Sequence, residues 1–113
     1  MWNVRDWRRR RILQRARLPD SLWRQTVAEL PLLRGLDAEE LARLRELVIL
    51  FRHQKVFVPR GGLELDDTME LTVSAQACLP VLNLGLDWYD GWRSVILYPE
   101  SFIAPHEEVD EAG

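Results

Sequence analysis

The fold is decided by residues 69–102, which read MELTVSAQACLPVLNLGLDWYDGWRSVILYPESF. Up to about residue 82 the stretch is almost free of charge, and a helix so poor in charged side chains must be largely buried. We therefore predict a buried helix over 68–82, with a kink or an end at Pro80. Glycines then bound an aromatic turn, and the β-branched residues of 94–98 predict a strand.

A further helix is predicted by an apolar stripe upstream of this stretch. Asp37 and Glu40 have capping-box spacing, in which each side chain satisfies a free backbone N–H group of the other residue. We place this helix at 38–53. A short β-branched and aromatic run over 55–58 predicts a strand after it. The stripe consists of Leu41, Leu44, Leu47, Val48 and Phe51.

The beginning of the chain predicts two shorter elements. Residues 1–18 read as a basic amphipathic segment that is partly helical. A helix from about 20 to 29 follows it, and Asp20 or Ser21 is the expected N-cap, because both side chains accept hydrogen bonds from free helical N–H groups. The apolar face expected for the basic segment consists of Trp2, Trp7, Ile12 and Leu13.

These elements predict an α+β fold in which three or four helices pack on a small sheet that includes 55–58 and 94–98. The chain has 113 residues and a mass of 13.3 kDa, which is the size of one domain or of part of one. Apolar residues make up 47% and charged residues 29% of the sequence, so the composition is that of a globular chain with a core.

Charge is distributed unevenly, although the net charge is only −3. Residues 1–17 carry seven arginines and one acid, whereas the last fourteen residues carry five acids and no lysine or arginine. We therefore divide the chain into a basic N-terminal segment (1–18), a scaffold region (19–104) and an acidic flexible tail (105–113).

The expected compartment is the cytoplasm. Cys78 is the only cysteine, so no internal disulfide can form, which fits a reducing environment. No long apolar run follows the arginine cluster, so a secretory signal is not recognisable. No stretch approaches the roughly 20 apolar residues that a membrane span needs, and we expect no membrane association.

Several short motifs, in a fixed order, resemble those of a known family. They are LPLL at 30–33, AQACLPVL at 75–82, Gly91-Trp92 and Tyr98-Pro99. With them, nearly the whole chain to about Phe102 resembles the zinc metallopeptidases of the Mlc titration factor A family. The resemblance implies the N-terminal part of a zincin-like, aminopeptidase-like cytosolic enzyme. It also implies zinc in the full-length protein and binding to the glucose repressor Mlc.

The zinc site of that family is not recognisable in this sequence. Family members carry a helix with the pattern H-E-F-A-H, in which two histidines four residues apart bind zinc and the glutamate activates the metal-bound water. Here the histidines are His53 and His106, and the nearest imitation, HEEVD at 106–110, has an aspartate in place of the second histidine. We expect no catalytic residue, no metal ligand and no bound zinc in this chain, and no activity when it is alone.

Two candidate functional surfaces follow from the 69–102 stretch. In zincins generally, a strand beside the catalytic helix aligns the substrate backbone, and Val95, Ile96 and Leu97 are our candidate for that strand. Trp88, Tyr89 and Trp92 are a candidate aromatic surface for contact with a peptide or a sugar. The alternative interpretation of these three residues is a hydrophobic anchor for the turn, which we favour.

Four other features have a functional and a structural interpretation, and we favour the structural one in each case. Cys78 is expected to be an inert core residue rather than a nucleophile. His53 is expected to be partly exposed near a helix end, and Asp66 and Asp67 are expected to cap a helix rather than form a catalytic carboxylate pair. The Arg8–Arg11 run is expected to be a solvated helix face rather than a contact for nucleic acid or a membrane.

Two functions of different classes remain open. The first is the scaffold of a peptidase whose catalytic helix lies beyond Gly113. The second is a non-catalytic module that binds a repressor or another regulator, and a decayed gene product is a third possibility. Because a core shared with an absent part leaves apolar surface exposed, we expect marginal stability or self-association through the 68–82 helix.

Overall fold

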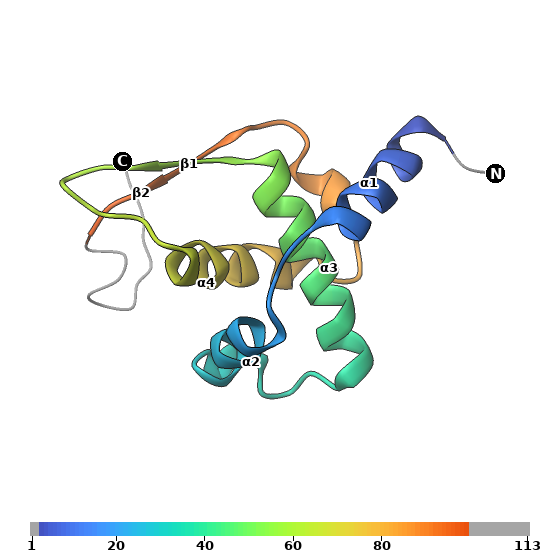
Figure 1. The fold of residues 1–113 in the computed structure, drawn as a ribbon, viewed down its shortest axis with the longest axis horizontal. Coiled ribbons are helices and arrows are strands. Elements are labelled where there is room, and N and C mark those ends of the chain that lie inside the picture. Colours follow the sequence, from blue (N-terminus) through green and yellow to red (C-terminus); the bar gives the residue numbers. More distant parts are fainter. Residues whose placement is uncertain (1–2, 100–113) are drawn as a thin grey trace.

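The structure is a computed structural model that describes residues 3–99 (Figure 1). Within this range the chain forms four α-helices, three short 3₁₀ helices and two strands, which confirms the predicted α+β fold. The acidic segment 105–113 and His106 lie outside the described residues. The elements are α1 (Val4–Arg15), α2 (Asp20–Ala28), η1 (Pro31–Leu33), α3 (Ala38–Gln54), β1 (Val56–Pro59), α4 (Asp67–Cys78), η2 (Leu79–Val81), η3 (Leu86–Tyr89) and β2 (Ser94–Leu97).

Helix α3 is the centre of the fold, and its start is the predicted capping box. The Asp37 carboxylate accepts a hydrogen bond from the Glu40 backbone N–H at 2.8 Å, and the Glu40 carboxylate accepts one from Asp37 at 3.0 Å. Helices α1 and α4 both pack against α3. None of the helices between residues 3 and 99 is long and apolar enough to cross a lipid bilayer. The buried residues of α3 are Leu44, Val48, Leu50 and Phe51.

Helix α4 is shorter than predicted, because it ends at Cys78 and continues as the 3₁₀ helix η2. Pro80 accounts for this end, since proline offers no N–H group and its ring clashes with the preceding turn. Asp66 caps the helix by accepting a hydrogen bond from Met69 N–H at 2.9 Å, as predicted. The core side of α4 consists of Leu71, Ser74, Ala75 and Cys78, while Val73 and Ala77 are only half-buried.

Two predictions for the N-terminal helices are wrong. No side chain caps α2, because its N-cap is Pro19; Asp20 lies within the first turn and pairs with Arg45 at 2.8 Å. Trp7 does not belong to an apolar core face, since it is 54% exposed. Only the side of α1 that carries Ile12 and Leu13 packs against the core, because α1 contacts α3 along one face.

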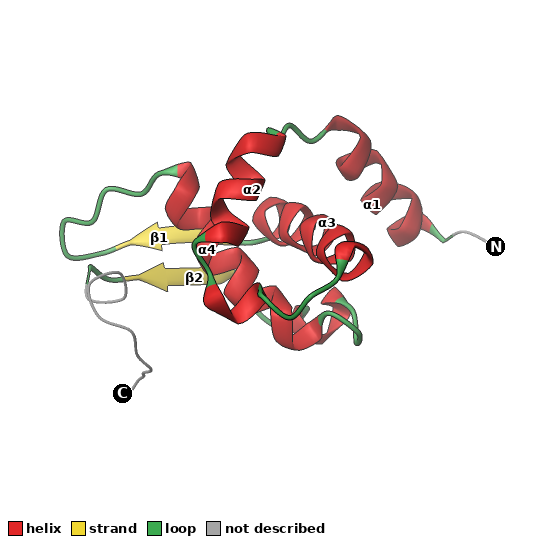
Figure 2. Ribbon diagram, turned by 90° about the horizontal axis from the view of Figure 1, so that it is seen from below, coloured by secondary structure: helices red, strands yellow, loops and turns green. Residues whose placement is uncertain are grey.

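The two strands form a parallel sheet, and the sheet and α1 lie at opposite ends of the molecule (Figure 2). Phe57 pairs with Val95, and both pack against the core. Val56 and Ile96 are each 50% exposed, so the outer face of the sheet is partly apolar.

The structure is that of a single chain, so self-association through 68–82 stays a prediction. The large apolar side chains that are exposed lie elsewhere, on α1, the sheet and the connecting turns. Among residues 3–99 they are Val4, Trp7, Leu32, Val56, Leu84, Trp88, Trp92, Ile96 and Tyr98.

Candidate functional site

The region that joins α3, η3 and β2 is organised around Phe51. This side chain is fully buried near the end of α3. Its ring meets three others edge-on, with centroids 6.1 Å from Phe57, 6.2 Å from Tyr89 and 5.9 Å from Trp92. Edge-to-face aromatic pairs at such distances are favourable beyond the area they bury. We call Phe51, Phe57, Tyr89 and Trp92 the aromatic cluster.

The three residues of the candidate aromatic surface therefore do not lie together: Tyr89 and Trp92 belong to the aromatic cluster, and Trp88 does not. Tyr89 and Trp92 lie together, with ring centroids 5.4 Å apart, and the Tyr89 hydroxyl donates a hydrogen bond to the Ala77 carbonyl at 2.7 Å. Burial raises the pKa of the Tyr89 hydroxyl. These two residues anchor the turn, as the favoured interpretation expects. Trp88 is 68% exposed and makes no ring contact within residues 3–99, whereas Trp92 is packed against Phe51 although 42% of it is exposed.

Lys55 is a structural residue of this region that the sequence pattern did not single out. Although it is a lysine, only 7% of it is exposed. Its ammonium donates hydrogen bonds to the carbonyls of Tyr89 at 2.5 Å and Trp92 at 2.6 Å, and lies 4.2 Å from the centre of the Trp92 ring. Burial lowers the pKa of Lys55; the Asp90 carboxylate opposes this effect and the Arg93 guanidinium adds to it. Lys55 thereby ties the turn before β2 to the end of α3.

One signal in the sequence pointed to Lys55. The chain has fifteen lysine and arginine residues, and fourteen of them are arginine. A single lysine among so many arginines, placed between a helix and a β-branched run, distinguishes this position, because lysine carries a compact ammonium on a flexible stem in place of a planar guanidinium.

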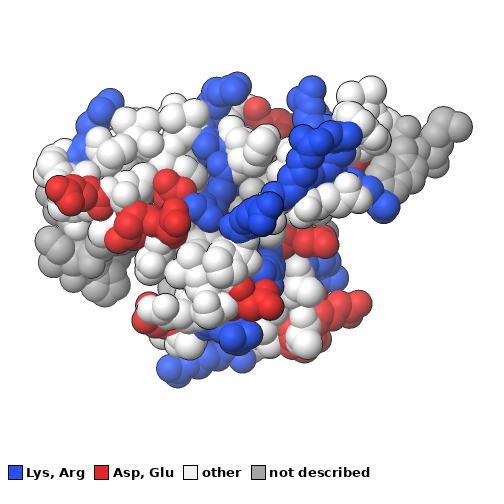
Figure 3. Space-filling model, in the orientation of Figure 1, with Lys and Arg blue, Asp and Glu red and all other residues white. Residues whose placement is uncertain are grey.

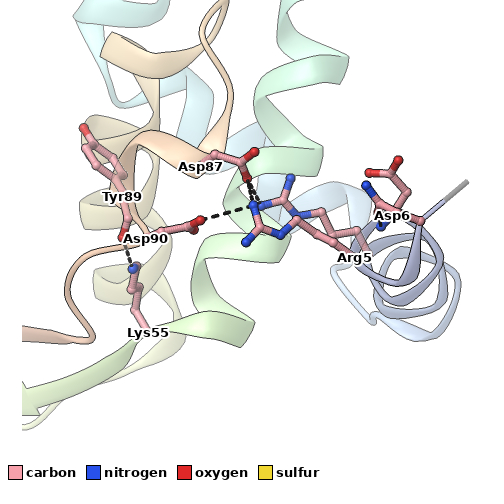
Figure 4. A network of polar contacts seen from close by, with 8 residues as sticks. Arg5, Asp6, Lys55, Asp87, Tyr89 and Asp90 are labelled. Carbon is pink, nitrogen blue, oxygen red and sulfur yellow. Dashed lines mark hydrogen bonds and ion pairs between the residues drawn. The ribbon is translucent and has the colours of Figure 1, made fainter.

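A second set of contacts ties α1 to the same turn (Figure 4). Arg5 pairs with Asp87 at 3.0 Å and with Asp90 at 3.2 Å, and Arg9 pairs with Asp87 at 2.5 Å. The hydrogen bond from Arg9 is the main reason that the pKa of Asp87 lies below its ordinary value. We call these four residues the α1 clamp. They show that two of the seven arginines in residues 1–17 have a structural role that spacing along the sequence did not reveal.

The candidate substrate-aligning strand has one paired edge and one free edge within the described range. β1 is its only neighbour there. The carbonyls of Arg93 and Leu97 accept hydrogen bonds from β1 and the residue after it, each at 2.8 Å. In a parallel ladder alternate residues of a strand bond to one neighbour, so the backbone groups of Ile96 point to the opposite edge. Leu97 is buried and holds the strand on the core, while Val95 is half-buried.

Residues 4–113 match the family described as glucose-regulated metallo-peptidase M90. Relatives in this group are named Mlc titration factor A. The protein of that name from Salmonella arizonae is 40% identical over 107 residues, which cover 95% of this chain and 41% of the relative. The one from an Enterobacter species is 40% identical over 97 residues, covering 84% of this chain and 36% of the relative.

The chain belongs to the glucose-regulated metallo-peptidase M90 family. The family resemblance noted from the sequence is thereby confirmed. The chain spans about two-fifths of the length of the curated relatives that it matches, 36% of the Enterobacter protein and 41% of the Salmonella protein.

The part of this M90 chain that is described does not fit a metal centre. No group of three or more His, Cys, Asp or Glu side chains between residues 3 and 99 is arranged to hold a metal ion. His53 is exposed in the last turn of α3 and belongs to no such group. Asp66 caps α4, and Asp67 pairs with Arg52 at 3.2 Å. We derive no catalytic step through zinc from these residues.

Cys78 is fully buried in the core, which confirms the structural interpretation. Burial raises the pKa of its thiol from 9.0 to about 12. A thiol with such a pKa is protonated at neutral pH, and it is therefore a poor nucleophile.

We expect Cys78 to make the fold sensitive to alkali. Because its pKa is higher in the folded than in the unfolded state, its contribution is complete below about pH 9 and is lost as the pH rises toward 12. Each pH unit in that window is worth about 1.4 kcal/mol, so the wild type should lose about 2 kcal/mol by about pH 10.5 through this group. Urea unfolding at several pH values should show a shallower alkaline loss for Cys78→Ala. Equal slopes for the two proteins would contradict this prediction.

Proposed function

We propose that residues 3–99 form the N-terminal scaffold of a zinc-dependent peptidase, and that β2 aligns the peptide substrate. The observation that carries the proposal is the free edge of β2, where the backbone groups of Ile96 have no partner strand among the described residues. The zinc ligands come from a part of the protein outside these residues. Membership in a metallopeptidase family supports the assignment of the reaction class.

The free edge is suited to an extended peptide. A peptide that adds to a sheet edge gains main-chain hydrogen bonds, whatever its side chains are. Such bonds hold the scissile peptide bond at a constant distance from the group that activates water. This positioning of the substrate is one of the contributions to catalysis. The role of Ile96 is therefore to supply an N–H group and a carbonyl to the substrate, and Leu97 keeps them in place.

The rest of the region keeps this strand rigid. Lys55 holds the carbonyls of Tyr89 and Trp92 just before β2 begins, and the aromatic cluster packs beneath that turn. A misplacement of about 1 Å in a substrate-aligning group lowers activity on the order of a hundredfold. The buried contacts of Lys55 are thus part of the proposed function as well as of the fold.

A chimera tests the proposal. The segment of the Salmonella relative that aligns with this chain is replaced by this chain, and hydrolysis of a chromogenic peptide anilide is measured. We expect the chimera to be active. Ile96→Pro removes the N–H group from the free edge without breaking a bond to β1, so it should lower kcat/KM by about tenfold or more, which corresponds to one lost hydrogen bond to the substrate.

Ile96→Thr is the matched control, since it keeps the N–H group and a β-branched shape. It should hydrolyse the anilide at nearly the rate of the parent chimera. An active chimera whose Ile96→Pro variant is equally fast would refute the role of β2. A folded chimera without any activity would refute the scaffold as a whole.

We infer two further properties of the chain itself. Tested alone, the purified chain should not hydrolyse the anilide, with or without added zinc, because its described residues offer no metal site. We also assign it to the cytoplasm, on the grounds of a single cysteine that is buried and unpaired.

A second function is favoured by the exposure of Trp88 and by the name of the relatives. That name, Mlc titration factor A, points to the repressor Mlc, and an exposed tryptophan is a frequent anchor of protein interfaces. Under this hypothesis the chain binds an Mlc-like repressor without catalysis.

Pull-down with an immobilised Mlc-type repressor tests this second function. We expect the wild-type chain to be retained and Trp88→Ala to be lost, with a penalty of about 2 kcal/mol in binding free energy. Leu32→Ala, which truncates another exposed apolar side chain on η1, serves as the control and should be retained. Retention of the Trp88→Ala chain at wild-type level would exclude Trp88 as the anchor.

A further inference from the structure

The arginines of helix α1 lie on different faces of the helix. Arg5 and Arg9 belong to the α1 clamp, which faces η3. Arg8, Arg11 and Arg15 follow one another at intervals of three and four residues, so they share a different face of the helix. Neither these three arginines nor Arg17 has a carboxylate within ion-pair distance among residues 3–99.

This second face of α1 lines a groove against α3, which we call the α1–α3 groove. Its volume is about 540 Å³, and Arg8, Arg11, Arg15 and Arg17 all line it. Figure 3 shows basic side chains gathered along α1 and continuing over the middle of the molecule. The single carboxylate in the lining is that of Glu70, and Arg52 already pairs with it at 3.1 Å. The groove therefore has an excess of positive charge.

The lining is not only basic. Ile12, Leu18 and Ile49 contribute apolar surface to the same groove. Trp7 is 54% exposed there, and the Arg11 guanidinium lies 5.0 Å from the centre of its ring. Apolar surface combined with a few convergent charged groups is the usual composition of a small-molecule site, and the volume lies within the usual range for such sites of roughly 300–1,000 Å³.

We propose that the α1–α3 groove binds a compact organic anion, namely a phosphate ester carried on an aromatic or apolar body. Guanidinium groups match the oxygens of a phosphate in pairs, and they retain their charge at any physiological pH. The apolar body would lie against Ile12 and Ile49, with Trp7 available for stacking. This site is separate from β2 and does not depend on the proposed peptidase scaffold.

The surroundings favour a compact ligand over nucleic acid. Asp67 and Glu70 flank Arg52 on one side of the groove. On the other side of α1, Glu46 and Asp6 line the adjoining groove and offset the positive charges of Arg9 and Arg10 there. A long polyanion would have to pass these carboxylates, in a chain whose net charge is −3, whereas a single phosphate ester would not.

The test is a calorimetric titration of the full chain with naphthyl phosphate at low ionic strength. Inorganic phosphate and naphthol serve as probes of the two halves of the ligand. We expect naphthyl phosphate to bind about tenfold or more tightly than either of them, because it uses the guanidinium groups and the apolar lining together. The Arg8→Ser/Arg11→Ser variant should bind it at least about tenfold more weakly.

The control variant is Arg24→Ser/Arg34→Ser, which has the same change of net charge at two exposed arginines on other elements. It should bind naphthyl phosphate like the wild type, and circular dichroism should show that both variants keep the wild-type fold. Equal loss in both variants would overturn the proposal, since it would reveal a general effect of charge. Absence of binding, or an affinity for thymidine oligonucleotides that grows steadily with their length, would overturn it as well.

Discussion

Replacing Phe51 by alanine should destabilise the protein by about 4 kcal/mol, the usual cost of truncating a fully buried phenylalanine. The side chain is completely buried, and three aromatic rings meet it at centroid distances of about 6 Å. Alanine would leave a cavity between α3, η3 and the sheet. Urea unfolding, followed by tryptophan fluorescence, should show a much lower midpoint with little change of slope.

Phe51→Leu is the matched control, because it keeps most of the apolar volume but none of the ring geometry. We expect a loss of about 1–2 kcal/mol for this variant. If Phe51→Ala remained within about 1 kcal/mol of the wild type, the aromatic cluster could not be the centre of this region. The rigid turn before β2 that the proposed function requires would then need another explanation.

Replacing Lys55 by methionine should cost about 3 kcal/mol, which is a large effect for the substitution of a basic residue. Methionine keeps the length of the apolar stem but cannot donate a hydrogen bond. The carbonyls of Tyr89 and Trp92 would lose their donor, and the contact between the ammonium and the Trp92 ring would vanish. Relief of the desolvation of the ammonium would offset part of this loss.

The same urea unfolding experiment tests Lys55, with Arg93→Met as the control. Arg93 is a neighbouring basic residue that is exposed, so its replacement should change the stability by no more than about 0.5 kcal/mol. If Lys55→Met proved as stable as the wild type, the hydrogen bonds of the ammonium would make no net contribution to the stability of the fold. In the chimera proposed above, Lys55→Met should also reduce kcat/KM, because β2 would lose the support of the turn that precedes it.

Much of the fold follows from short-range patterns. The capping box of α3, the cap at Asp66 and the end of α4 near Pro80 each depend on residues within about four positions of one another. The burial of Cys78 follows from the lack of charge along its helix. Both strands lie within one residue of their predicted bounds, because β-branched runs and prolines mark them.

The candidate site depends more on contacts between distant residues. Val95, Ile96 and Leu97 were predicted as a strand, but its parallel pairing with β1 joins residues 38 positions apart, such as Val56 and Ser94. That pairing alone decides that Ile96 faces the free edge. Likewise, Trp88 and Trp92 look alike in the sequence, and only the tertiary structure shows that Phe51 anchors the partly exposed ring of Trp92 and not that of Trp88.

The amino-acid sequence alone determined the helices, the strands and the family, because caps and apolar periodicity depend on neighbouring residues and the order of motifs can be read along the chain. Only the tertiary structure decided which arginines of α1 belong to the α1 clamp and which line the α1–α3 groove. It also decided the burial of the single lysine, Lys55. The physical reason is that charge and hydrogen-bond partners of these residues come from positions more than thirty residues away. No periodicity within a helix reports which distant element will cover each of its faces.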